Sequence, residues 1–137
     1  MRPSLDLAKK VLPAPLLKAL RRMFEQRLDG CMLVGGTALA GFYAGHRRSD
    51  DLDVFTQGGT SQTAAVLAAR SLESLGARVD VRQNSESYFR ARCALDGHDF
   101  TVDVSAAPPA FRAGRSVALA GGLAVADLDL LLVLKAA

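Results

Sequence analysis

The chain has 137 residues, 50% of them hydrophobic, and a net charge of +3 from 17 basic and 14 acidic side chains. This length predicts one domain with a sizeable core, and the apolar content excludes a disordered chain. There is neither an apolar run of about 18 residues nor a signal-peptide pattern, so we expect a soluble, cytoplasmic protein with no membrane contact. The mild positive charge permits binding to a polyanion without indicating it.

The N-terminal part is predicted to hold one helix. Residues 1–13 read as a lead-in, and Pro13 punctuates the start of the helix. Apolar residues then recur at helical spacing over residues 15–28, with basic residues between them, which predicts a helix that docks on a sheet. Its basic side is expected to face solvent, with a nucleic-acid contact as the alternative. Asp29-Gly30 ends the helix and leads into a strand.

The next stretch combines a short strand with a glycine turn. Residues 31–34 are apolar and stop at Gly35-Gly36, which predicts a buried strand that enters a turn. Thr37 follows at the position of a helix N-cap, so we expect a short helix there. A glycine turn before a helix leaves backbone N–H groups accessible, and these groups favour phosphate. Gly35, Gly36 and Thr37 are therefore candidate phosphate ligands.

Two aspartates follow on a second predicted strand. Acidic and apolar residues alternate over residues 51–54, which places Asp51 and Asp53 on one face of the strand. Two neighbouring carboxylates repel each other unless a cation or a proton lies between them. We expect Mg²⁺ (or Mn²⁺) as the cofactor, because such ions bind hard oxygen ligands and are commonly shared with substrate phosphates. A lone Gly-Gly or Asp-x-Asp is more often structural, but their order and spacing together favour a site.

These residues resemble the nucleotidyltransferase superfamily that includes DNA polymerase β. Members carry a Gly-Gly or Gly-Ser turn, a helix, Asp-x-Asp on a strand and a third carboxylate on a later strand. The segments GGTAL (residues 35–39) and HRRSDDLD (residues 46–53) are similar to segments of AbiEii/AbiGii toxin-like nucleotidyltransferases. The resemblance implies an α+β nucleotidyltransferase fold with α/β-type layers, in which helices cover mainly one face of a mixed sheet. Arg47 is expected to pair with the carboxylates or with a substrate phosphate, and Ser49 to contact phosphate or metal-bound water, whereas His46 is expected to make a structural hydrogen bond.

The middle of the chain is predicted to form a helix and three strands. The helix covers residues 60–75, and alternating patterns predict strands over residues 77–83, 88–95 and 100–105. Asp96-Gly97 is expected to form a tight turn between the last two strands. Both cysteines, Cys31 and Cys93, lie in apolar strand patterns and are expected to be free buried thiols, although a disulfide or metal site is the alternative.

The third carboxylate of the superfamily is expected at Asp103. This residue alternates with valines on the last of these strands, and it would bind the metal and accept the proton of an attacking hydroxyl. An isolated aspartate in a strand is more often a surface residue, and the upstream motif is what favours a catalytic role. Asp99 and Asp80 are weaker candidates for the same position.

The C-terminal part is predicted to end in one short helix. Pro108-Pro109 breaks the chain, and residues 111–122 are expected to be loop or irregular strand. Asp127 can cap a helix over residues 128–134 that ends in Lys135. AbiEii-like proteins carry a lysine in a similar DLLxxK setting, which implies that Lys135 binds nucleotide. The alternative is that this lysine complements the helix dipole.

The expected protein is a single nucleotidyltransferase core over residues 1–137 without the helical C-terminal part usual in the family. The resemblance implies transfer of a nucleoside monophosphate from an NTP to RNA, such as a tRNA acceptor end, or to a protein, in a toxin–antitoxin or phage-defence setting. An antitoxin, a helical partner protein or a homodimer is an expected partner. The alternatives are a minimal antitoxin-type enzyme that modifies a partner protein and a non-catalytic nucleotide-binding or interaction module.

Overall fold

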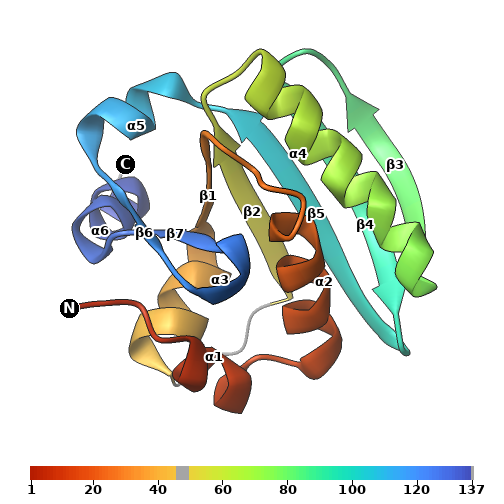
Figure 1. Ribbon diagram of the computed structural model, residues 1–137, viewed down its shortest axis with the longest axis horizontal. Coiled ribbons are helices and arrows are strands. Elements are labelled where there is room, and N and C mark those ends of the chain that lie inside the picture. The colour runs from red at the N-terminus through yellow and green to blue at the C-terminus, as the bar shows by residue number, and fades with distance from the viewer. Residues whose placement is uncertain (46–49, 137) are drawn as a thin grey trace.

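A computed structural model describes residues 1–45 and 50–136. Its centre is a seven-stranded mixed sheet in the order β3-β4-β5-β2-β1-β7-β6 (Figure 1). The strands are Cys31–Val34 (β1), Asp51–Thr56 (β2), Arg78–Asn84 (β3), Tyr88–Leu95 (β4), His98–Ala106 (β5), Ser116–Ala118 (β6) and Ala124–Ala126 (β7). β2 pairs antiparallel with β1 and parallel with β5, while β1 and β7 are parallel. The mixed sheet confirms the predicted α+β fold.

The helices pack mainly against one face of this sheet. They are Leu5–Val11 (α1), Ala14–Phe24 (α2), Gly35–Leu39 (α3), Thr60–Arg70 (α4), Pro108–Ala113 (α5) and Leu128–Ala136 (α6). Ala40–Ala44 forms a π-helical turn (η1), and Ser71–Leu75 and Ala120–Gly122 form 3-10 turns (η2 and η3). Figure 1 shows α2 and α4 across the part of the sheet made by β2, β5 and β4. The opposite face of these strands carries many polar side chains, together with Phe55 of β2. None of the described helices is long and apolar enough to cross a bilayer.

Strand alternation produces the core under α2 and α4. Leu52 of β2, Val102 of β5 and Phe89 of β4 are completely buried on this face. One glutamine of α4 lies among them: the Gln62 Nε2 donates to the Val104 carbonyl at 3.0 Å, and its Oε1 accepts from the Thr56 hydroxyl at 2.7 Å. Polar groups inside a core are tolerated when they are paired in this way. The glutamine thereby ties α4 to both β2 and β5.

The hairpin between β4 and β5 confirms the predicted turn. Asp96 and Gly97 have φ values of 51° and 78°, so both central residues of this two-residue turn are left-handed. Such a turn matches the twist of the strands and fixes their pairing residue by residue. One result is that Arg90 of β4 lies directly opposite Asp103 of β5.

The predicted lead-in over residues 1–13 is wrong, because it contains α1. The Leu7 backbone N–H donates to Ser4 Oγ at 3.1 Å, so a side-chain N-cap starts this short helix. Ala8 of the same helix is completely buried. The following helix, predicted over residues 15–28, ends earlier, at Phe24.

The prediction of loop or irregular strand over residues 111–122 is also wrong in part. Pro108 does not break the chain here but begins α5, in which a proline occupies the first turn. Proline suits that position because its missing N–H would have no partner inside the helix. β6 then pairs with β7 at the edge of the sheet.

Candidate active site

The pairing of β2 with β5 brings the predicted carboxylates together. In this parallel register Asp53 lies opposite Asp103, and Asp51 lies opposite Thr101. Because alternate residues share a face, Asp51, Asp53 and Asp103 all belong to the face of the sheet away from α2 and α4. The structure therefore assembles on neighbouring strands the carboxylates that lie far apart in the sequence.

The weaker candidates for the third carboxylate, Asp99 and Asp80, line a second cavity that also includes Asp51 but neither Asp53 nor Asp103. Asp99 pairs with Ala94, four residues before Asp103 on β5, which is about 13 Å along a strand. Asp80 lies on β3, at the edge of the sheet. The register thus favours Asp103 over both alternatives.

Gly35 lets the backbone of α3 approach the aspartates closely. Val34, which precedes it, pairs with Asp53 across β1 and β2. Gly35 has a φ of +76°, and a Cβ built on it would overlap the Asp53 carboxylate. Glycine is needed here for its backbone conformation and for space. The adjacent Gly36 is exposed at the start of α3.

Thr37 has a different place from the predicted one. The N-cap of α3 is Val34, so Thr37 lies inside the helix, and the N-cap prediction is wrong. The threonine is completely buried, and its hydroxyl donates to the backbone carbonyl of Asp51. A buried hydroxyl is stabilised by such a partner. This bond fixes the start of β2, where the first aspartate lies, against α3.

The carboxylates differ in what they contact. Asp51 Oδ1 accepts a hydrogen bond from the Thr101 hydroxyl at 2.5 Å. Asp103 Oδ1 accepts one from the Tyr88 hydroxyl at 2.6 Å and lies 3.5 Å from Nη1 of Arg90. Sequence reasoning did not identify any of these three partners, although all three are polar residues on the face that carries the aspartates.

The surroundings of Asp53 disfavour its negative charge. Burial, then the charges of Asp103 and Asp51, raise the pKa of Asp53 from 3.8 to about 6, while Arg90 acts in the opposite direction. A raised carboxyl pKa means that the folded protein holds this negative charge at a cost. The site therefore favours the arrival of a cation or a proton beside Asp53.

The donor set suits Mg²⁺ or Mn²⁺ in chemistry and register. These ions bind carboxylate oxygens, and the aspartates provide them from adjacent strands. In the described part of the chain, however, no three acidic, histidine or cysteine side chains converge enough to hold a metal ion. Oδ1 of Asp51 and Oδ1 of Asp103 are instead engaged by protein donors. Cation binding by all three aspartates would therefore require their side chains to rearrange.

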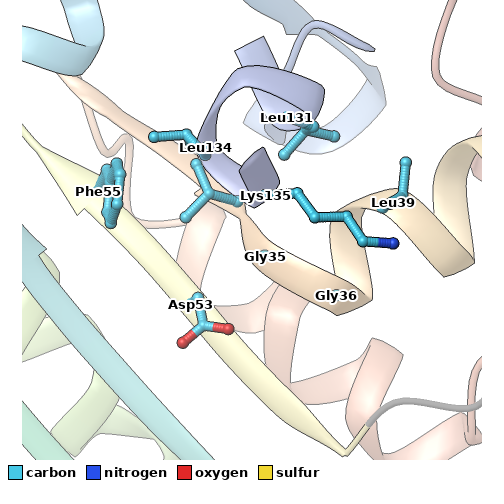
Figure 2. A pocket seen from close by; sticks show the side chains of 9 residues that line it. Gly35, Gly36, Leu39, Asp53, Phe55, Leu131, Leu134 and Lys135 are labelled. Atoms are coloured by element: carbon cyan, nitrogen blue, oxygen red, sulfur yellow. The ribbon is translucent and has the colours of Figure 1, made fainter. Parts of the chain in front are cut away.

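A cavity of about 440 Å³ adjoins Asp53. It is lined by Val34, Gly35, Gly36, Leu39, Asp53, Phe55, Leu131, Leu134 and Lys135. Figure 2 shows α6 side chains on one side of it and Asp53 and Phe55 of β2 on the other. Its volume is in the range of small-molecule sites, and its walls are apolar apart from an acid and a base.

This cavity connects Lys135 with the other predicted site residues. Lys135 is far from the aspartates in sequence, yet it lines the same cavity as Asp53 and Gly35. Arg47 and Ser49, predicted to lie near phosphate, and His46 are outside the described residues. Phe55 was not predicted, although it follows Asp53 by two positions and therefore shares its face.

The cysteines are free and buried, as the sequence predicted. Burial raises the pKa of both Cys31 and Cys93 to about 11. A thiol with such a pKa is a poor nucleophile at neutral pH. Their contribution is to packing.

Comparison with known proteins identifies the fold. The sequence matches no protein-family model and no curated protein. A candidate nucleotidyltransferase from H. pylori has a similar structure, with a TM-score of 0.61 and 18% identity over 90% of this chain and 58% of that chain. JHP933 from Helicobacter pylori gives a TM-score of 0.59 and 18% identity over 97% of this chain and 57% of that one. The Megavirus polyadenylate synthase gives a TM-score of 0.50 and 11% identity over 98% of this chain and 29% of that one. This chain thus spans less than two thirds of each of these proteins, and the part it spans has the nucleotidyltransferase fold.

Proposed function

We propose that this protein is a metal-dependent nucleotidyltransferase. It transfers a nucleoside monophosphate from an NTP to an acceptor hydroxyl. The observation that carries the proposal is the register that places Asp53 opposite Asp103 beside the close approach of Gly35. The nucleotidyltransferase fold and the sequence segments that resemble AbiEii-like enzymes support the same function.

The aspartates form the proposed reaction centre. Asp51, Asp53 and Asp103 are the residues that would hold Mg²⁺ or Mn²⁺, and a cation there would neutralise charge on the triphosphate during transfer. The acceptor oxygen forms a bond to the α-phosphorus, the bond to the leaving oxygen breaks, and pyrophosphate departs. Asp103 accepts the proton of the attacking hydroxyl. Burial and the charges of Asp103 and Asp51 raise the pKa of Asp53 to about 6, so its negative charge is disfavoured and a cation beside it would be stabilising.

The substrate is proposed to lie along the cavity beside Asp53. Backbone N–H groups at Gly35-Gly36 and the Lys135 ammonium contact the phosphates, as the apposition of these residues around one cavity suggests. Thr37, Arg47 and Ser49 remain predicted phosphate contacts. The apolar wall, which includes Phe55 and two leucines of α6, suits the nucleoside.

The acceptor is proposed to be RNA, such as a tRNA acceptor end, or a protein, in a toxin–antitoxin or phage-defence setting. This finer assignment depends on the resemblance of GGTAL and HRRSDDLD to AbiEii-like segments. An antitoxin, a helical protein or a second copy of the chain is the proposed partner. One observation favours a second function, that of a nucleotide-binding module without transfer activity: Asp103 is engaged by Tyr88 and Arg90 rather than turned toward its neighbours.

Calorimetric titration of each of the four NTPs with Mg²⁺ tests the proposal without knowledge of the acceptor. We expect the wild type to bind at least one NTP, and Asp51→Ala and Asp53→Ala to lose that binding while they remain folded. Asp6→Ala is the matched control, because Asp6 is an exposed aspartate of α1 outside the proposed centre. Nucleotide binding that survives the first two substitutions would contradict the proposal. Binding to none of the NTPs would contradict it for the chain alone and favour a site completed by a partner.

A further inference from the structure

Asp103 has two different protein partners on the neighbouring strand β4. Tyr88 donates its hydroxyl to Oδ1 at 2.6 Å, which is the length of a strong hydrogen bond to a charged acceptor. Nη1 of Arg90 lies 3.5 Å from the same atom, longer than a charge-assisted hydrogen bond. The tyrosine thus fixes the orientation of the carboxylate, and the arginine adds a positive charge held more loosely.

The exposure of the ion pair shows which partner is able to move. The Arg90 side chain is 45% exposed, whereas that of Asp103 is 14% exposed. An ion pair with an exposed partner contributes little to stability, because water solvates the released charge. The arginine can therefore leave for solvent at little cost, while the aspartate stays in place.

Arg90 brings a positive charge to the face that carries Asp51, Asp53 and Asp103. It lies opposite Asp103 in the β4–β5 pairing, and Asp103 in turn lies opposite Asp53 in the β2–β5 pairing. It is thus a positive side chain at the place where the cation of the proposed function would be needed. A cation and a guanidinium that share one carboxylate oxygen compete for it.

We propose that Arg90 is a built-in counter-ion of Asp103 that competes with the divalent cation and so sets the cation affinity of the site. This inference rests on the proposed function and adds a positioning residue to it. Arg90 compensates the charge of Asp103 before the cation arrives, then turns out to solvent. Tyr88 keeps its hydrogen bond and prevents the carboxylate from following the arginine.

Titration of the protein with Mn²⁺ in the absence of nucleotide, followed by water-proton relaxation, tests this competition. We expect Arg90→Gln to bind Mn²⁺ about tenfold more tightly than the wild type, because a positive charge a few ångströms away has been removed. Arg90→Lys retains the charge and should return the affinity toward the wild-type value. The control is Arg92→Gln, since Arg92 is an exposed arginine two residues further along the same face and lies opposite Thr101. It should change the affinity by about twofold or less.

A double-mutant cycle separates direct competition from a general effect of charge. In an Asp103→Asn background, Arg90→Gln should no longer tighten Mn²⁺ binding, because the shared oxygen has lost its charge. Unchanged or weaker binding by Arg90→Gln would overturn the inference, as would equal tightening by Arg92→Gln. These results would leave the proposed function intact. Wild-type protein with no Mn²⁺ binding that depends on Asp53 would overturn both.

Discussion

The two faces of β2 and β5 differ in how well their polar groups are paired. On the buried face, the Gln62 side chain pairs with the Thr56 hydroxyl and with a backbone carbonyl of β5, so its amide is used on both sides. On the other face, Asp53 lies opposite Asp103, and burial together with the charges of Asp103 and Asp51 raises its pKa to about 6. One face of these strands thus binds a polar side chain that stabilises the fold, and the other carries a carboxylate whose charge is unfavourable in the folded state. An unfavourable charge that the fold retains is typical of a functional site.

Substitution of Gln62 should have the largest effect on stability. Gln62→Ala leaves the Thr56 hydroxyl and a β5 carbonyl without this partner in a dry core and opens a cavity, so we expect a loss of about 3 kcal/mol in the free energy of unfolding. Urea unfolding measures this loss. Gln83→Ala is the control, because Gln83 is exposed on the edge strand β3, and we expect a change of about 0.5 kcal/mol or less. Similar losses in the two variants would show that the buried bonds do not matter.

Substitution of Gly35 should reduce stability less, but it should also weaken cation binding at the aspartates. Gly35→Ala combines a left-handed backbone with an overlap on Asp53, and we expect a loss of about 2 kcal/mol. Gly97→Ala isolates the backbone contribution, because Gly97 has a φ of +78° and no atom within 4 Å of an added Cβ. We expect about 1 kcal/mol for this control. In the titration with Mn²⁺, only Gly35→Ala should weaken binding, since only it displaces the Asp53 carboxylate. Equal effects of both variants on stability and on binding would show that the close approach of Gly35 to Asp53 does not matter.

The sequence predicts the parts of the site that depend on local rules. Alternation over residues 51–54 predicts that Asp51 and Asp53 share a face, and the order of glycine turn, helix and aspartates predicts the superfamily fold. The pairing of Arg90 with Asp103 could also be predicted from the sequence. Counting back equally on both sides of the Asp96-Gly97 turn pairs Arg90 with Asp103, and this pairing is the one in the structure.

Other features depend on tertiary packing and could not be predicted in this way. β2 and β5 are parallel neighbours separated by two other strands in sequence, so their register is set by the core and not by a turn. The presence of Lys135 and Asp53 in one cavity depends in the same way on how α6 packs near α3. The missed helices are different, since Ser4 and Pro108 were local start signals that the pattern of apolar residues did not emphasise.

Substitution of Asp53 should give the smallest change, with the opposite sign. A carboxyl whose pKa rises from 3.8 to about 6 on folding binds a proton more tightly in the folded state, so its contribution to stability falls as pH rises between these values. Asp53→Asn removes this charge. At pH 7.5 without divalent cations, we expect the variant to melt about 3–5 °C above the wild type. At pH 4 the two should melt at nearly the same temperature, because the folded wild type is then protonated at Asp53.

Calorimetric melting curves from pH 4 to pH 8 measure this difference in melting temperature. Added Mg²⁺ should reduce the advantage of the variant. A cation that binds only the folded state stabilises it, and Asp53 is a proposed ligand, so Mg²⁺ should raise the melting temperature of the wild type more than that of Asp53→Asn. Asp6→Asn is the control, since Asp6 is exposed on α1 and is not one of the three site aspartates, and the variant should follow the wild type at every pH. If Asp53→Asn melted below the wild type throughout, the carboxylate would be a stabilising group. The contrast between the two faces of β2 would then fail at the residue on which it depends most.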